Sequence, residues 1–200
     1  DTLVLDEVDR MLDMGFVADI KSVVSQITQK HQTLFFSATI DKKIEALIDT
    51  FLVDPVKVSV KTAPTSSHVD QDVIRVGRHQ KEEVLCSLLK KPEFKKVLIF
   101  ASTKMYTEKL YLSLQQKGFK VGSIHGDKRQ NQRLSTIKSF KNDKLNILVA
   151  TDVAARGLDI HDISHVINYD QPATYEDYIH RIGRTGRADK KGCALTFIEP

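Results

Sequence analysis

Ile147-Leu148-Val149-Ala150-Thr151-Asp152 is the stretch of sequence that most clearly indicates the fold. Its four consecutive apolar residues predict a short strand in a parallel sheet that is covered by helices on both faces. The polar residues directly after it predict a turn that opens a short helix near Val153. Because ligands of such sheets bind beyond the carboxyl ends of the strands, this turn stands where a binding site is expected.

The same alternation of strands and helices continues on both sides of this stretch. Between it and residue 71, and toward the C-terminus, we expect strands at residues 73–76, 97–100, 121–124, 165–169 and 193–198, with helices at 81–90, 104–117, 130–140 and 175–184. Nearer the N-terminus, we expect strands at residues 3–5, 33–36 and 56–60, with helices at 17–27 and 41–51. Short connections between such elements predict βαβ units with right-handed crossovers. The predicted fold class is α/β, with parallel sheets flanked by helices.

A break in this periodicity predicts two domains. Residues 61–69 contain the run Ala63-Pro64-Thr65-Ser66-Ser67, which is rich in turn-forming residues. We expect domains at residues 1–61 and 71–200, with a linker at 62–70. The first domain begins directly with a buried-strand pattern, so we expect the chain to be a fragment and this domain to be truncated. Missing strands would leave an open apolar edge and make it the less stable half.

Composition excludes several classes of protein. The net charge of +4 allows nucleic acid as a partner without requiring it. Cys86 and Cys193 form no CxxC pair, so neither a disulfide framework nor a zinc site is indicated. No apolar run approaches the ~18 residues of a membrane span. We therefore expect no membrane association and an intracellular, cytoplasmic setting.

Polar motifs come directly after the first two predicted strands. Carboxylates in Asp6-Glu7-Val8-Asp9 can hold a metal ion and orient a water molecule at a strand end. Alternatively, Asp6 or Asp9 caps the helix that follows. The hydroxyls of Ser37-Ala38-Thr39 have the same alternative as caps of the next helix.

Polar residues also follow three strands of the second domain. They are Ser102, His125-Gly126-Asp127 and Thr151. Small residues, hydroxyls and a glycine at neighbouring strand ends can present backbone N–H groups to phosphates. Helix capping explains each motif alone, but it explains less well why all three coincide.

Arginines recur every third residue near the end of the chain, at Arg181, Arg184 and Arg187. The first two are expected to project from one face of a helix. Gly183 and Gly186 lie between the arginines and would let the backbone approach a ligand. Guanidinium groups gathered in this way suit the binding of a polyphosphate, whereas a solvated basic face is the alternative.

Taken together, these motifs resemble those of the DEAD-box ATP-dependent RNA helicases. The resemblance is carried by Asp6-Glu7-Val8-Asp9, Ser37-Ala38-Thr39, residues 97–100, His125-Gly126-Asp127 with Gln130 and Arg133, residues 151–159 and residues 180–187. Each motif is short, but all come in the family's order and spacing and extend over nearly the whole chain.

The resemblance implies two RecA-like domains, the first partial and the second complete, which bind ATP with Mg²⁺ in their cleft and single-stranded RNA on their joint surface. Asp6 and Glu7 would hold Mg²⁺ through water, Arg184 and Arg187 would act as arginine fingers, and Asp159 would contact the ATP ribose. The residues that would couple the nucleotide state to domain closure are Asp9, Ser37, Thr39 and His180. Those that would lie at or beside the RNA backbone are Ser102, Gly126, Asp127, Gln130, Arg133 and Thr151.

Two departures from the family's pattern affect these expectations. Val8 stands where the family has alanine, which we expect to tune the site without abolishing it. The sequence contains neither G-x-x-x-x-G-K-[ST] nor the adenine-reading glutamine motif, so the chain alone should bind and hydrolyse ATP poorly. The alternatives are a non-catalytic RNA-binding module, which the missing phosphate loop would favour, and a DNA translocase of the same superfamily.

Overall fold

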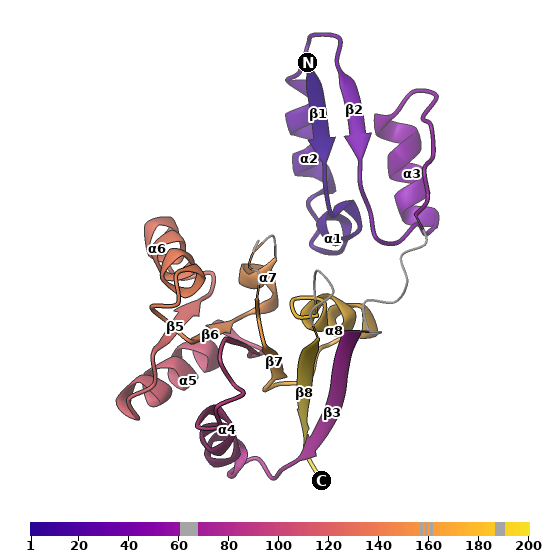
Figure 1. Ribbon diagram of the computed structural model, residues 1–200. Helices are drawn as coiled ribbons and strands as arrows, with labels where there is room; N and C mark the ends of the chain where they lie inside the picture. The colour runs from indigo at the N-terminus through magenta and orange to yellow at the C-terminus, as the bar shows by residue number, and fades with distance from the viewer. Residues whose placement is uncertain (61–67, 157, 159, 161, 187–190) are drawn as a thin grey trace. The chain divides into compact units, whose positions relative to one another are not determined.

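A computed structural model describes residues 1–60, 68–156, 158, 160, 162–186 and 191–200. The chain divides into two compact units, Asp1–Val60 (unit 1) and Lys61–Pro200 (unit 2) (Figure 1). In each unit the described strands are parallel and helices connect them. The predicted α/β fold class is therefore confirmed.

Unit 2 is built on a six-stranded parallel sheet with the order β3-β8-β7-β4-β6-β5. Its strands are β3 (Val69–Arg75), β4 (Val97–Phe100), β5 (Val121–Ile124), β6 (Ile147–Ala150), β7 (His165–Asn168) and β8 (Gly192–Ile198). Its helices are α4 (Lys81–Leu89), α5 (Lys104–Gln116), α6 (Gln130–Lys141), α7 (Asp152–Ala155) and α8 (Tyr175–Ile182). Apart from β3, each predicted end lies within two residues of the observed one. No helix of the described residues has both the length and the apolar content to cross a membrane.

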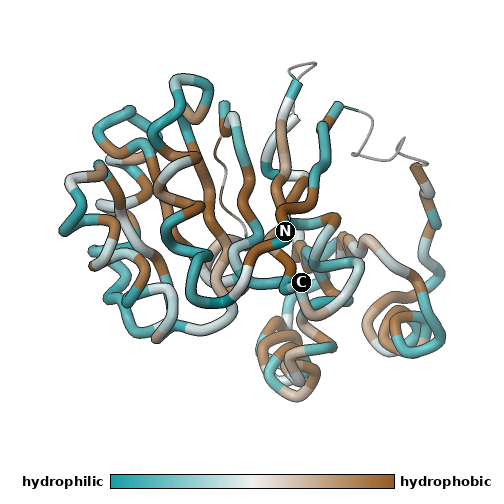
Figure 2. The backbone as a smooth tube through the Cα atoms, turned by 90° about the horizontal axis from the view of Figure 1, so that it is seen from below, coloured by the Kyte–Doolittle hydropathy of each residue, from teal (hydrophilic) through white to brown (hydrophobic). Residues whose placement is uncertain are grey.

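Side chains of the central strands alternate between two cores, one on each face of the sheet. Leu98 and Phe100 contact the core formed with α6, α7 and α8, whereas Val97 and Ile99 contact the core formed with α4 and α5. The hydrophobic residues accordingly run along the strands, between the helices (Figure 2). Right-handed crossovers explain which helices share a face, because α4 and α5 move the chain one way across the sheet and the other three return it.

The first strand of unit 2 starts earlier than predicted. β3 begins at Val69, so residues 69–70 belong to the sheet and not to a linker. Val69 is 5% exposed and pairs with Gly192 of β8. A strand partner more than a hundred residues away holds this segment, whose own sequence has no continuous apolar run.

Unit 1 contains a two-stranded parallel sheet with three helices. Its elements are β1 (Thr2–Leu5), α1 (Val8–Asp13), α2 (Val17–Ser25), β2 (Gln32–Phe35) and α3 (Lys42–Phe51). The predicted strand at residues 56–60 is wrong, because Val56, Val58 and Val60 are 90%, 82% and 76% exposed. No strand of the described residues lies beside them, and an alternating pattern without a partner gains no ladder of hydrogen bonds.

Unit 1 is expected to be digested before unit 2 in limited proteolysis. A two-stranded sheet is marginally stable, and Val4, Phe36 and Ile40 of unit 1 are 53%, 52% and 59% exposed. The central strands of unit 2 are buried on both faces. Mass spectrometry of a tryptic time course should show a long-lived product that starts after residue 60. Earlier cleavage within unit 2 would contradict this expectation.

Candidate functional site

The first candidate carboxylates lie at the carboxyl end of β1. Glu7 has φ 51° and ψ 44°, a left-handed conformation that costs a residue with a side chain about 1–2 kcal/mol. It is also the N-cap residue of α1, but its side chain makes no capping hydrogen bond. Asp6 Oδ1 accepts a hydrogen bond from the Glu7 amide at 2.9 Å, so Asp6 does not cap α1 either. Backbone strain of this kind concentrates at functional sites.

The two carboxylates fit a magnesium site in their chemistry. Mg²⁺ prefers oxygen ligands and is often held by one or two carboxylates together with water and substrate phosphates. Asp6 is exposed and Glu7 is half-buried, so water can reach both. Among the described residues, no group of three or more His, Cys, Asp or Glu side chains is placed to hold a metal ion.

The polar residues after β1 and β2 contact one another. Asp9 Oδ2 accepts hydrogen bonds from the backbone N and from Oγ1 of Thr39, each at 3.1 Å. Ser37 Oγ donates to the Thr39 carbonyl at 2.6 Å. The N-cap of α3 is instead Asp41, which accepts from the amides of Lys43 and Ile44. The alternative interpretation of the hydroxyls as helix caps is therefore wrong.

In unit 2, Arg181 and Arg184 have different surroundings. Arg181 is 3% exposed and forms two parallel hydrogen bonds with the Asp152 carboxylate at 2.6 and 2.8 Å. Its Nη1 donates to Asn168 Oδ1 at 3.2 Å and to the Asp170 carbonyl at 2.7 Å. Arg181 and Arg184 line the same small cavity, but the hydrogen bonds of Arg181 are made inside the unit. Arg181 is a structural residue that joins α8 to the ends of β6 and β7.

Arg184 follows the end of α8, and its Nη1 donates to the Leu158 carbonyl at 3.1 Å. It lines the same small cavity as His180, so the structure brings these two predicted site residues together. Asp159 and Arg187 lie outside the described residues.

The glycines of this segment serve the fold of the chain itself. Gly183 is the C-cap residue of α8. Gly186 has φ 68°, and a Cβ on it would lie 2.6 Å from Val69 Cγ2 and 3.0 Å from the His68 carbonyl oxygen. The close approach predicted between Gly186 and a ligand is thus an approach between two parts of unit 2.

The three polar strand ends of unit 2 meet at one edge of the sheet. β4, β6 and β5 are neighbours and parallel, so Ser102, Thr151 and Gly126 follow adjacent strands at their carboxyl ends. Thr151 is the N-cap residue of α7 but makes no side-chain cap, whereas the neighbouring Thr103 caps α5 with its hydroxyl. Capping therefore accounts for only part of this pattern.

The remaining candidates lie in the turn after β5 and at the start of α6. Gly126 and Asp127 are exposed, and Asp127 Oδ1 accepts a hydrogen bond from Lys104 Nζ at 2.9 Å. Gln130 Oε1 accepts from Arg133 Nη1 at 3.4 Å, while Arg133 Nε is buried without a hydrogen-bond partner. These residues form a polar surface, with side chains of both charges, beside the carboxyl ends of β4, β6 and β5.

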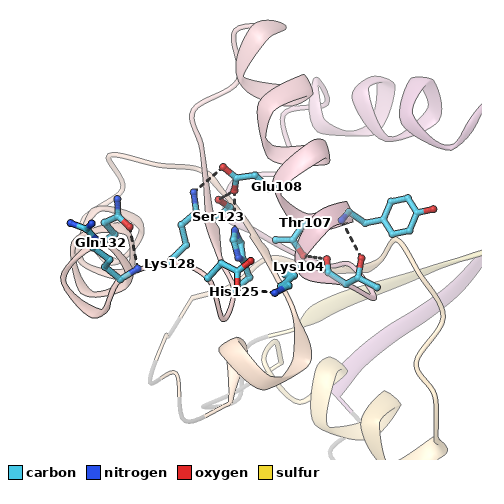
Figure 3. Close-up of polar contacts among 11 residues, drawn as sticks. Lys104, Thr107, Glu108, Ser123, His125, Lys128 and Gln132 are labelled. Atoms are coloured by element: carbon cyan, nitrogen blue, oxygen red, sulfur yellow. Dashed lines mark hydrogen bonds and ion pairs between the residues drawn. The ribbon is translucent and has the colours of Figure 1, made fainter.

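Sequence reasoning did not identify Glu108, a residue of α5 whose carboxylate contacts Ser123, His125 and Lys128 (Figure 3). Burial would by itself raise the pKa of the Glu108 carboxyl, but hydrogen bonds from these three side chains outweigh that effect and lower the pKa. No local signal marks Glu108, because its partners follow it by 15 to 20 residues and meet it only through packing of α5 against β5.

Two family models match the chain. The model described as helicase conserved C-terminal domain matches residues 80–189, and the DEAD/DEAH box helicase model matches residues 1–47. Among curated proteins, the ATP-dependent RNA helicase CshA of Listeria monocytogenes is 42% identical over 201 residues. That alignment covers 100% of this chain and 39% of the relative, so the chain spans about two fifths of the relative's length.

Solved structures of the same kind of protein also match. A DEAD box protein from Methanococcus jannaschii is 40% identical with a TM-score of 0.63, and the match covers 100% of this chain and 54% of that chain. Dbp5 of S. cerevisiae, solved bound to RNA and ADP BeF3, is 29% identical with a TM-score of 0.86 and the same coverage.

Proposed function

The chain belongs to the DEAD-box RNA helicases, and we propose that it is part of an ATP-dependent RNA helicase. In the whole enzyme, RNA-stimulated ATP hydrolysis would drive the unwinding of RNA duplexes or the remodelling of RNA–protein complexes. Unit 2 has a RecA-like helicase fold, and unit 1 has part of one. We assign residues 1–61 to the C-terminal part of the ATP-binding domain and the residues from β3 onward to the second domain. We also propose that the protein acts in the cytoplasm.

The shared edge after β4, β6 and β5 supports this proposal most strongly. A Cβ on Gly126 would meet no heavy atom within 4 Å, and the backbone there is not left-handed. The fold itself therefore gives no reason for a glycine at this position. Close approach of a nucleic-acid backbone does give one, and the neighbouring hydroxyls and amides suit phosphate and sugar oxygens. Contacts of this kind would make RNA binding nearly independent of base sequence.

The proposed hydrolysis divides its residues between the two units. Asp6 and Glu7 would hold Mg²⁺ through water, and Glu7 would position or deprotonate the attacking water. Arg184 and Arg187 would stabilise the charge on the transferred phosphoryl group, and Asp159 would contact the ribose. Because neither unit contains both sets, hydrolysis would require domain closure.

Closure would be favoured by RNA that binds both units. We assign Asp9, Ser37, Thr39 and His180 to the polar network that links the nucleotide state to closure. The hydrogen bonds of Asp9 with Thr39 support this assignment, because they already join the ends of β1 and β2. The assigned RNA residues are Ser102, Gly126, Asp127, Gln130, Arg133 and Thr151.

Gly126→Ala is expected to weaken RNA binding about tenfold without changing the thermal stability of unit 2. The added methyl has room in the unbound protein but would occupy the space of an approaching backbone, at a cost of about 1.4 kcal/mol. Fluorescence anisotropy with labelled single-stranded RNA and a thermal melt measure the two quantities. Gly77→Ala is the matched control and should change neither, since Gly77 also has ordinary φ and a Cβ on it would meet only Gln80 Oε1, at an ordinary contact distance of 3.7 Å.

The decisive test of the proposed function is ATP hydrolysis by this chain joined to a segment that carries a P-loop. Single-stranded RNA should raise the rate, DNA should not, and Arg184→Ala should abolish the stimulation. Stimulation by DNA would favour a DNA translocase. RNA binding without hydrolysis would favour a non-catalytic RNA-binding module.

A further inference from the structure

Glu108 holds both ends of the turn that follows β5. Its Oε2 accepts a hydrogen bond from His125 Nε2 at 3.0 Å, and its Oε1 accepts from Lys128 Nζ at 2.9 Å (Figure 3). The backbone N of Lys128 also donates to the His125 carbonyl at 3.1 Å. Residues 125–128 therefore form a closed turn, with His125 and Lys128 at its ends and Gly126 and Asp127 at its two central positions.

The hydrogen bonds of Glu108 to this turn are partly shielded from water. The Glu108 side chain is 34% exposed, and its partners His125 and Lys128 are 6% and 23% exposed. Ser123 Oγ, in the buried strand β5, donates to Oε2 at 2.9 Å and fixes the carboxylate from a third side. By contrast, the ion pair of Lys104 with Asp127 has side chains that are 58% and 61% exposed, and such pairs contribute little.

We propose that Glu108 is a positioning residue for RNA binding, which holds the turn so that exposed Gly126 and Asp127 meet the RNA backbone. The inference rests on the proposed function, since it assumes that this turn contacts RNA. Glu108 itself lies behind the turn, on α5, and touches the ends of the turn and not its exposed centre.

Loss of the negative charge of Glu108 and loss of its positioning role would change the affinity for RNA in opposite directions. A negative charge near the RNA surface repels phosphates, and Glu108 also neutralises the Lys128 ammonium group. If charge alone mattered, Glu108→Gln would strengthen RNA binding. If Glu108 positions the turn, the same change should weaken binding, because one amide oxygen cannot accept from all three donors that the carboxylate serves.

Glu82 provides a matched control, because it lies on α4 and contacts a different part of α5. Its carboxylate, on α4, accepts hydrogen bonds from Ser113 and from Lys117. Glu82→Gln therefore removes one charge from the same combination of a serine hydroxyl and a lysine, but it leaves the turn after β5 untouched. It should not weaken RNA binding.

The test is fluorescence anisotropy of the full chain with labelled single-stranded RNA at several salt concentrations, after thermal melts establish that each variant is folded. Glu108→Gln is expected to raise the Kd about tenfold without making the salt slope shallower, because Gly126 and Asp127 carry no positive charge and Lys128 loses its carboxylate partner. Glu82→Gln should keep the original slope. Unchanged or tighter binding by Glu108→Gln, or an equal loss of affinity in Glu82→Gln, overturns the inference.

Three outcomes keep the inference separate from the proposed function and from misfolding. If the unaltered chain does not bind RNA, the proposed function fails and the inference fails with it. If the chain binds RNA and Glu108→Gln binds equally well, only the inference fails. If Glu108→Gln does not fold, Ser123→Ala removes one donor and keeps the charge. Its expected result is a smaller loss of affinity, and no loss there also overturns the inference.

Discussion

Asp152→Ala is expected to lower the free energy of unfolding of unit 2 by about 3–5 kcal/mol. The reason is the Arg181 guanidinium, which is 3% exposed and cannot lose its proton. Without the Asp152 carboxylate, its acceptors among the described residues are the neutral Asn168 Oδ1 and Asp170 carbonyl, which leave a buried positive charge without a counter-ion there. Urea unfolding followed by circular dichroism measures the change, since the chain contains no tryptophan for fluorescence.

A double substitution separates this charge effect from simple loss of packing. Asp152→Ala combined with Arg181→Met should cost less than Asp152→Ala alone, because the buried charge is removed together with its partner. The exposed pair of Arg78 with Glu199, whose side chains are 78% and 60% exposed, is the control. Glu199→Ala should change stability by no more than about 0.5 kcal/mol. Strictly additive losses at Asp152 and Arg181 would show that the two residues are not coupled.

The central strands of unit 2 could be predicted from sequence because a strand that is buried on both faces consists of a continuous run of apolar residues. β4 and β6 consist wholly of buried residues, and their predicted bounds match the observed ones. The errors in the predicted strands occur where pairing with a distant strand, and not the local sequence pattern, determines whether a segment joins a sheet. Val69 joins the sheet through its distant partner Gly192, whereas residues 56–60 alternate like a strand but have none beside them among the described residues.

The same distinction between local sequence pattern and contacts of distant residues applies to the candidate site. Residues that follow strands were identifiable, because parallel topology brings the ends of β4, β6 and β5 to one edge whatever the side chains are. The spacing of the arginines could not reveal that Arg181 turns to Asp152, which precedes it by 29 residues. Glu108 was missed for a related reason, because a glutamate on an amphipathic helix looks like any solvated one until the helix is packed.

Glu7→Gln is expected to lower the RNA-stimulated kcat about 10²–10⁴-fold in the chain joined to a P-loop-bearing segment. The proposed role of Glu7 is to position or deprotonate the attacking water, and an amide of nearly the same shape cannot accept the proton. KM for ATP should change little, because the substituted side chain keeps its size and its place at the end of β1. Residual activity above a tenth of the original would contradict the role.

The backbone at Glu7 allows chemistry and folding to be tested apart. Its φ of 51° strains any residue with a side chain, and glycine adopts this region without that cost. Glu7→Gly should therefore leave unit 1 at least as stable while abolishing hydrolysis. Thermal melts and steady-state kinetics on the same samples measure both properties. If Glu7→Gly instead destabilised unit 1, the glutamate side chain would be needed for the fold, and the strain could no longer be attributed to function.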